Sequence, residues 1–242
     1  MDSVIKIENV SKKYGGLIAV KNVELELRRG EVLGMIGPNG AGKSTLFNLI
    51  TNIERADGGQ ILVLGKNQKR RKPEQICHMG VGRTFQIVKP FGNLTVLQNV
   101  MVSTFSHQND ETNAKAYALK ILEFVGLYDR RDTLGYDLPL PGLKRLELAR
   151  ALGTKPKILL LDEVMAGLNP GEINQMINLL VKINQNGCTL FVIEHVMRAI
   201  MALSERVVVL HLGQKIMEGT PMEVVSEPEV IKAYLGKEYV HS

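Results

Sequence analysis

The sequence predicts an α/β protein with a mostly parallel sheet, an antiparallel β layer at the N-terminal end and an inserted helical subdomain. Segments 4–10 and 23–27 alternate apolar and polar residues, which is typical of half-exposed antiparallel strands. Segments 32–37 and 158–161 are apolar without alternation, as strands buried on both faces are. Residues 95–152 carry apolar side chains three and four positions apart, which is the period of a helix.

Further elements follow from local signals. A helix is expected to begin near Gly42 and run through "KSTLFNLI", with a strand at 61–65, and Gly126 is expected to end a helix over "NAKAYALKILEFVGL". In the last third, strands and helices are expected in turn at 157–162, 169–187, 189–194, 195–205 and 206–210, before a hairpin into "KIMEG".

The C-terminal end carries two capping-box patterns. Thr220 precedes Glu223 by three residues, with Pro221 between them, and Ser226 precedes Glu229 by the same spacing. Each pattern predicts the start of a short helix. The whole chain, 1–242, is therefore expected to be one domain, with its helical subdomain at approximately 87–152.

The composition is that of a globular protein in a reducing compartment. The longest aliphatic runs fall far below the roughly 18 residues that span a bilayer, and the N-terminus shows no secretory signal. Cys77 and Cys188 do not form a disulfide framework, so a cytoplasmic location is expected. The basic run "KNQKRRK" (66–72) has no aromatic residue to stack on bases, and we expect a solvated loop. The alternative is a positive potential that attracts nucleotide or membrane headgroups.

The segment "GPNGAGKST" (37–45) matches G-x-x-x-x-G-K-[ST] between an apolar strand and a predicted helix. In that setting, backbone N–H groups of the loop and of the helix start hold phosphate oxygens. Lys43 would neutralise the β/γ oxygens, and the Ser44 hydroxyl would bind Mg²⁺. The sequence thus predicts a P-loop NTPase core that binds ATP and Mg²⁺, with nucleotide contacts at Gly37, Pro38, Asn39, Gly40, Ala41, Gly42, Lys43, Ser44 and Thr45.

Four polar residues follow other predicted strands. Asp162 and Glu163 end the strand "ILLLDE", at the sheet edge where ligands of parallel α/β sheets bind. We expect Asp162 to hold Mg²⁺ and Glu163 to act as the general base on the attacking water, rather than both acids simply ending a strand. Gln86 and His195 end two further predicted strands, "VGRTFQ" and "FVIEH". Gln86 could sense Mg²⁺ and the water, and His195 could donate a hydrogen bond to the γ-phosphate, although either residue alone is more often structural.

Together these motifs resemble the ATP-binding subunit of ABC transporters over essentially the whole chain. The resemblance includes the loop at 37–45, Gln86, Asp162 with Glu163, the "AGLNP" turn at 166–170 and His195. It implies that Tyr14, in "KKYGG", stacks on adenine. Finer details resemble the branched-chain amino-acid importer group, namely "RTFQIVKPFGNLTVLQNV", Asn169 in place of the usual Asp, "VIEHVM" and the closing "EPEVIKAYLG". Lipopolysaccharide-export ATPases share many of these sequence features.

The family signature, typically Leu-Ser-Gly-Gly-Gln, opens a helix that points at the ATP of a second subunit. The matching positions here, counted back from "RLELAR", are Leu138, Pro139, Leu140, Pro141 and Gly142. Pro139 replaces the serine hydroxyl, and Pro141 offers no backbone N–H. Losing charge-assisted hydrogen bonds of ~1.5–3 kcal/mol each would loosen this contact. We therefore expect an asymmetric heterodimer with a partner that has a complete signature. The alternative is a symmetric homodimer in which the remaining donors suffice.

The resemblance also implies partners and a place in the cell. Besides the second ATPase subunit, these are membrane permease subunits and, indirectly, a solute-binding protein, with the chain peripheral on the cytoplasmic face of the inner (plasma) membrane. Pro90, Phe91 and Leu94 could contact the permease or pack inside the helical subdomain. No nucleic-acid partner is expected. Soluble ABC ATPases that act in DNA repair or on ribosomes usually carry a long coiled-coil insertion or two cassettes in one chain, and this sequence shows neither. Three rival functions stay open from the sequence, namely a soluble non-transport ABC ATPase, a non-hydrolysing regulatory module and a P-loop kinase.

Overall fold

The computed structural model describes residues 2–108 and 110–235, and these fall into two compact units. The first unit comprises 1–79 and 189–242, and the second comprises 80–188. The predicted helical segment, 87–152, belongs to the second unit. Gly236, the last residue of "EPEVIKAYLG", lies outside the described residues.

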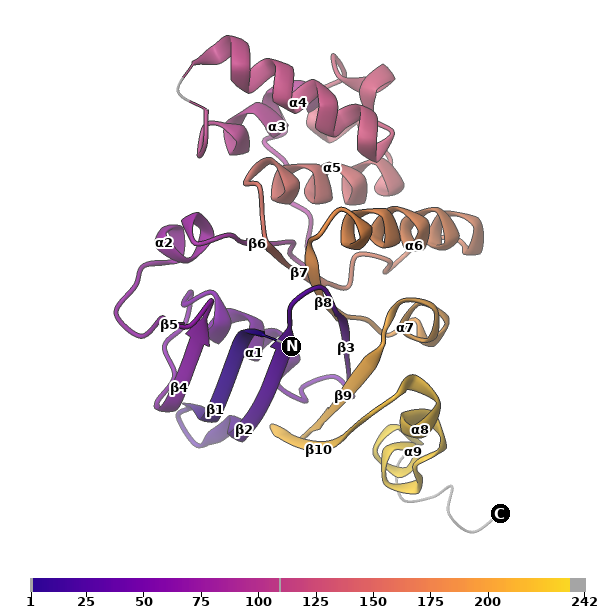
Figure 1. The fold of residues 1–242 in the computed structure, drawn as a ribbon. Coiled ribbons are helices and arrows are strands. Elements are labelled where there is room, and N and C mark those ends of the chain that lie inside the picture. Colours follow the sequence, from indigo (N-terminus) through magenta and orange to yellow (C-terminus); the bar gives the residue numbers. More distant parts are fainter. Residues whose placement is uncertain (1, 109, 236–242) are drawn as a thin grey trace. The chain divides into compact units, whose positions relative to one another are not determined.

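The antiparallel layer predicted at the N-terminal end is present in the first unit (Figure 1). Its strands lie in the order β2-β1-β4-β5, with bounds Ser3–Tyr14 (β1), Leu17–Arg28 (β2), Gly58–Val63 (β4) and Lys66–Asn67 (β5). The inner face of β2 is apolar, with Leu25 opposite Ile7 and Leu27 opposite Ile5 of β1. The alternating pattern that predicted these strands therefore reflects a sheet with only one face packed on a core.

The parallel strands of the first unit are buried throughout or nearly so. β3 (Val32–Ile36) pairs in parallel with β8 (Thr189–Ile193) and β9 (Arg206–His211), and β10 (Gln214–Gly219) adds an antiparallel edge to β9. The helices of this unit are α1 (Lys43–Ile50), α2 (Pro73–His78), α7 (Met197–Leu203), α8 (Pro221–Ser226) and α9 (Pro228–Leu235). Phe47 of α1 packs edge-on against Phe191 of β8, with ring centroids 5.0 Å apart, so the loop that precedes α1 stands on a rigid support.

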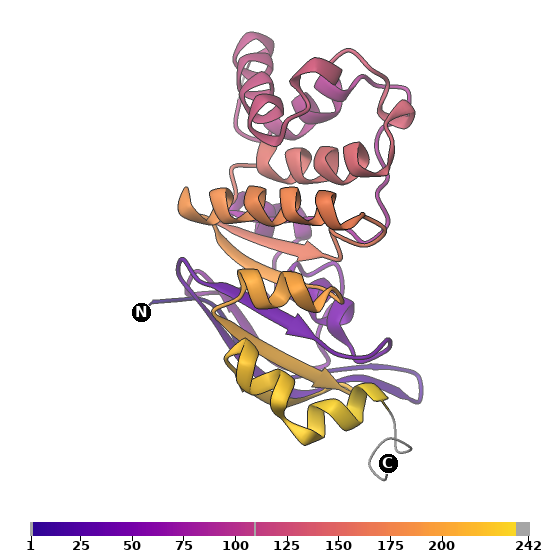
Figure 2. The same cartoon turned by 90° about the vertical axis from the view of Figure 1, so that its right-hand side faces the viewer.

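The second unit combines two parallel strands, β6 (Val81–Arg83) and β7 (Ile158–Asp162), with four α-helices. These helices are α3 (Val96–Thr104), α4 (Glu111–Val125), α5 (Leu140–Gly153) and α6 (Pro170–Gln185). The two short 3₁₀ turns η1 (Tyr128–Arg130) and η2 (Gly135–Asp137) lead into α5. Helices α3 and α4 pack on one side of α5, and α6 lies on its other side (Figure 2). Gly126 ends α4 with φ 74°, as the sequence predicts.

Three local predictions differ from the structure. Thr220 caps α8 with Glu223 as expected, but Ser226 is the last residue of α8 and donates its hydroxyl hydrogen to the Met222 carbonyl. The next helix begins at Pro228, because proline needs no N–H partner in a first turn. In the basic run, which was expected to be a solvated loop, Lys66 and Asn67 pair with β4 and Gln68 is buried, and the unpredicted helix α2 begins just after the run. Strand β8 ends at Ile193 and helix α7 begins at Met197, so His195 lies in the turn between them and neither ends the strand nor starts the helix.

Candidate nucleotide-binding and hydrolysis site

The phosphate loop runs from the end of β3 to the start of α1, in the first unit. Gly37, Gly40 and Gly42 all have positive φ, at 155°, 78° and 101°. A Cβ at Gly37 would collide with the Leu210 carbonyl oxygen, and one at Gly42 with that of Ala19. Gly40 has open space around it, as close approach of a phosphate requires. Apart from the motif itself, nothing in the sequence indicated that packing leaves no room for a side chain at position 37.

Lys43 and Ser44 occupy the first turn of α1. The Lys43 side chain is buried, and its Nζ donates hydrogen bonds to the carbonyl oxygens of Gly37 (2.6 Å) and Pro38 (3.0 Å). These contacts hold the ammonium group inside the curve of the loop. Ser44 is exposed at the second helical position. The loop, the helix N-terminus and a fixed cation together fit the polyphosphate of a nucleotide.

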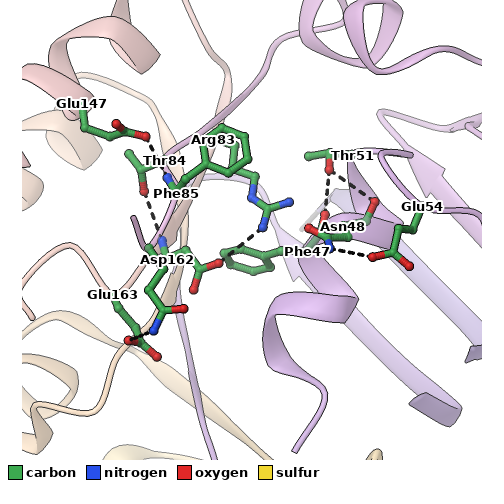
Figure 3. A network of polar contacts seen from close by, with 11 residues as sticks. Phe47, Asn48, Thr51, Glu54, Arg83, Thr84, Phe85, Glu147, Asp162 and Glu163 are labelled. Atoms are coloured by element: carbon green, nitrogen blue, oxygen red, sulfur yellow. Dashed lines mark hydrogen bonds and ion pairs between the residues drawn. The ribbon is translucent and has the colours of Figure 1, made fainter. Parts of the chain in front are cut away.

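Tyr14 is the last residue of β1 in the same unit, and its side chain is 42% exposed. Its hydroxyl donates to Oε2 of Glu54, whose Oε1 accepts a hydrogen bond from Nδ2 of Asn48 in α1 (2.9 Å; Figure 3). Partial burial and the Glu54 carboxylate raise the pKa of Tyr14 to about 12. The phenol therefore stays neutral, its hydroxyl is held by Glu54, and Nζ of Lys12 lies over the ring, 5.4 Å from its centroid.

His195 follows β8, which lies beside β3 with Met35 opposite Ile193. Because the two strands are parallel, the phosphate loop and the segment after β8 leave the sheet at the same edge. His195 is exposed, and its backbone N–H donates to Oε2 of the buried Glu194 (3.3 Å). Within the first unit, the phosphate loop and His195 thus lie at the same end of one sheet, whereas Tyr14 ends a strand of the antiparallel sheet.

In the second unit, Asp162 is the last residue of β7 and lies beside the segment that follows β6. Asp162 is 2% exposed, and its Oδ2 lies 3.3 Å from Nη2 of Arg83. Its backbone N–H donates to the Thr84 hydroxyl (3.1 Å; Figure 3). Burial lowers the pKa of the Arg83 guanidinium, and the Asp162 carboxylate opposes this shift. The Asp162 carboxylate and the Ser44 hydroxyl are hard oxygen donors of the kind Mg²⁺ prefers.

Glu163 and Gln86 are in direct contact. Nε2 of Gln86 donates to Oε2 of Glu163 (2.7 Å), and Glu163 has φ 51°, in the left-handed region. The prediction that Gln86 ends a strand was wrong, because β6 ends at Arg83. The exit from the strand at Thr84 gives Gln86 the reach to meet Glu163, and the loop is fixed by Glu147, whose Oε1 accepts the Phe85 N–H (2.9 Å).

The signature positions open α5, as the sequence predicts, with one change in register. Pro139 is the N-cap, Leu140 is the first helical residue and Pro141 is the second. Proline is tolerated there because the first N–H groups of a helix have no partner inside it. Of the signature positions inside the helix, only Leu140 and Gly142 keep a backbone N–H. Leu140 packs closely on Gly167 of the "AGLNP" turn.

Asn169 in that turn has a structural role. Its Oδ1 accepts the Glu172 N–H (3.0 Å), and Oε2 of Glu172 accepts the Asn169 N–H (2.8 Å), which completes a capping box for α6. Asparagine and aspartate serve equally well at an N-cap, so the exchange leaves α6 intact. Sequence reasoning missed four further side chains around this site, Arg83, Thr84, Lys144 and Glu147. Their only signal is polarity within otherwise buried segments.

A family profile described as "ABC transporter" matches residues 20–166. The chain belongs to the ABC transporter family. As a member it binds nucleotide and is an ATPase, and the predicted family and fold are confirmed. A second profile, described as "Branched-chain amino acid ATP-binding cassette transporter", matches residues 214–240. Within the described residues, no helix of this ABC protein is long and apolar enough to cross a membrane.

Similar proteins match along nearly the whole chain. The high-affinity branched-chain amino acid transport ATP-binding protein LivG of Salmonella typhimurium is 37% identical, over 97% of this chain and 98% of that protein. BraF of Pseudomonas aeruginosa, which carries the same description, is 36% identical with the same coverage. Among solved structures, a nucleotide-free ATP-binding cassette of an ABC transporter has a TM-score of 0.89 and 31% identity, covering 98% of this chain and 100% of that one. A dimeric cassette bound to ADP and Pi has a TM-score of 0.82 and 26% identity, covering 90% and 98%.

Proposed function

We propose that this ABC protein is the ATP-hydrolysing subunit of an importer for branched-chain amino acids that acts on a separate membrane permease. The observation that carries this proposal is the whole-length similarity to LivG and BraF, together with the C-terminal profile match at 214–240. The names of these relatives favour an amino-acid importer over a lipopolysaccharide-export ATPase. On this proposal, the chain is peripheral to the cytoplasmic face of the membrane, and any solute-binding protein acts on it indirectly.

The first unit would hold the nucleotide. Loop residues 37–45 would surround the phosphates, and Lys43 would exchange its contacts with the loop carbonyls for phosphate oxygens. The ring of Tyr14 would stack on the adenine, since Glu54 fixes its hydroxyl and leaves the ring exposed. His195, on the same sheet edge, would donate to the γ-phosphate. Tyr14 is thus the one contact that would distinguish a base from a bare polyphosphate.

The second unit would supply the groups for hydrolysis. Glu163 would accept a proton from the attacking water, and Gln86, already hydrogen-bonded to it, would orient that water. Asp162 and Ser44 would hold Mg²⁺, with Gln86 sensing the ion. When bound, Mg²⁺ would neutralise charge that develops on the β and γ oxygens. Arg83 holds the buried Asp162 carboxylate in place through its ion pair at 3.3 Å.

The partner in the dimer would be a different ATPase subunit with a complete signature. The hydroxyl and one amide donor that the family signature uses are replaced by Pro139 and Pro141, whereas the phosphate loop of this chain is intact. The chain would then contribute its intact phosphate loop to one strong ATP site and its weak signature to a second, weak site. The alternative is a symmetric homodimer, and the solution mass in the presence of ATP distinguishes the two.

The permease would contact the exposed apolar side chains that follow β6. Phe85, Ile87 and Phe91 are 47%, 70% and 45% exposed, which is unusual for neighbouring large apolar residues. The buried Asn99 fixes this segment, because its side chain accepts the Phe91 N–H (2.8 Å) and donates to the Phe91 carbonyl (3.0 Å). Pro90 and Leu94 are half-buried, so Phe91 is the stronger contact candidate of the three predicted residues.

The proposed function is tested in cells in which this gene is replaced by the Glu163→Gln variant. We expect uptake of labelled leucine to fall to the background of a deletion strain, while uptake of an unrelated amino acid such as arginine stays normal. A Glu123→Gln variant, altered at an exposed glutamate of α4, is the control. Normal leucine uptake in the deletion strain would refute the importer assignment, whereas normal uptake in the Glu163→Gln strain alone would refute only the proposed role of Glu163.

A further inference from the structure

Helix α5 carries two buried charged side chains one turn apart, Lys144 and Glu147. They are 4% and 6% exposed, although lysine and glutamate are almost never this buried unless they are paired. Burial raises the pKa of Glu147, while the Phe85 N–H, Arg150 and Lys144 act in the opposite direction. A pair kept buried at such a cost needs specific contacts, and those contacts lie at the site described above.

The two side chains hold both ends of the Phe85–Gln86 step. Oε1 of Glu147 accepts the backbone N–H of Phe85 at 2.9 Å, and Nζ of Lys144 lies 3.4 Å from the backbone carbonyl oxygen of Gln86 (Figure 3 shows the Glu147 contact). An anion thus binds the amide and a cation binds the carbonyl. This arrangement fixes the backbone of Gln86 in position and orientation.

Lys144 also holds the backbone of Glu163. Its Nζ donates to the Glu163 carbonyl oxygen at 2.9 Å. Glu163 has φ 51°, a conformation that is unfavourable for a residue with a side chain and persists only where surrounding contacts impose it. The hydrogen bond from Lys144 is one such contact. The two side chains that meet at 2.7 Å, Gln86 and Glu163, are therefore both attached to α5 through their main chains.

We propose that Lys144 and Glu147 form a positioning clamp that ties α5 to Gln86 and Glu163. Neither residue touches substrate, and both act through the main chain of residues that are expected to. Because α5 begins at the signature positions, a shift of its N-terminus would pass directly to Gln86 and Glu163. The clamp would thereby let this subunit hydrolyse ATP only when α5 is correctly placed. This inference rests on the proposed roles of Glu163 and Gln86.

The test uses the full chain assembled with its partner ATPase subunit and permease, and four variants, Lys144→Met, Lys144→Arg, Glu147→Leu and Glu147→Gln. We expect Lys144→Met and Glu147→Leu to lower kcat about 10- to 100-fold, since misplaced groups lose activity steeply with distance. The KM for ATP and the affinity for a fluorescent ATP analogue should stay within about twofold, because the phosphate loop belongs to the other unit. Lys144→Arg should recover part of kcat. Lys182→Met, at an exposed lysine of α6, is the matched control.

Hydrogen exchange supplies a readout that does not depend on turnover. The Phe85 amide should exchange faster in Glu147→Leu, and less so in Glu147→Gln, which keeps an acceptor oxygen. If a large substitution prevents folding, the conservative pair Lys144→Arg and Glu147→Gln carries the test with smaller losses of kcat in the same order. Unchanged kcat and unchanged Phe85 protection in the folded variants would overturn the clamp.

The two proposals fail in different ways. Turnover that survives in Glu163→Gln removes the proposed role of Glu163 itself. Turnover that is lost in Glu163→Gln but kept in Lys144→Met and Glu147→Leu leaves that role intact and removes only the clamp.

Discussion

Replacing Glu163 by glutamine is expected to lower ATP turnover by about 10²–10⁴-fold, the range that a positioned general base contributes. Glutamine keeps the size of the side chain and can still accept the hydrogen bond that Gln86 donates at 2.7 Å. It cannot accept a proton from water at neutral pH. The local structure should therefore survive while the chemical step fails, and ATP should stay bound instead of being converted to ADP.

The measurement is phosphate release under single-turnover conditions, combined with the affinity for ATP. Glu123→Gln serves as the control, because Glu123 is an exposed residue of α4. A Glu163→Gln variant that releases phosphate at the wild-type rate would assign the base to another group. An equal loss of ATP affinity would instead show that Glu163 matters for binding.

Replacing Lys43 by alanine is expected to weaken ATP binding about 100-fold. Nζ of Lys43 already makes two short hydrogen bonds to the loop, and charge-assisted hydrogen bonds to phosphate are worth ~1.5–3 kcal/mol each. Losing about 2.7 kcal/mol corresponds to a factor of 100 in the dissociation constant. Because the side chain is buried, some loss of stability should accompany the change.

The affinity is measured with a fluorescent ATP analogue, and thermal unfolding is followed in parallel to separate binding from folding. Lys69→Ala removes an exposed lysine of the basic run and should leave both values unchanged. An affinity within twofold of wild type in folded Lys43→Ala would show that the loop does not bind phosphate in the way we propose.

Local signals predicted the elements of the fold better than their ends. Uninterrupted apolar runs identified β3, β7 and β8, and the helix stop at Gly126 followed from a single residue. The prediction that Ser226 starts a helix was wrong, because the capping-box spacing alone does not distinguish a start at Ser226 from one at the nearby Pro228. Helix α2 was missed because its six residues are too few for a clear helical period.

Motifs predicted the site residues, but no motif could predict which side chains surround them. Arg83 and Asp162 are 79 residues apart, and Glu147 and Phe85 are 62 apart, so no local pattern links them. The helical period of α5 marks Lys144 and Glu147 as surface positions as readily as buried ones. Only the packing of α5 shows that both are buried beside Gln86 and Glu163. The catalytic and ligand-binding roles of the individual residues stay predictions.

We propose that this subunit works as half of a dimer that closes around ATP, and that Pro139 and Pro141 prevent two copies of this chain from forming that dimer. The direct test is the solution mass by light scattering of Glu163→Gln with Mg²⁺ and ATP, with Pro139→Ser and Pro141→Gly added in a second sample. We predict that Glu163→Gln binds ATP and stays a monomer, and that the signature substitutions let its mass double when ATP is added. Doubling with both prolines in place would contradict the asymmetric dimer, and a monomer in both samples would contradict the closure around ATP.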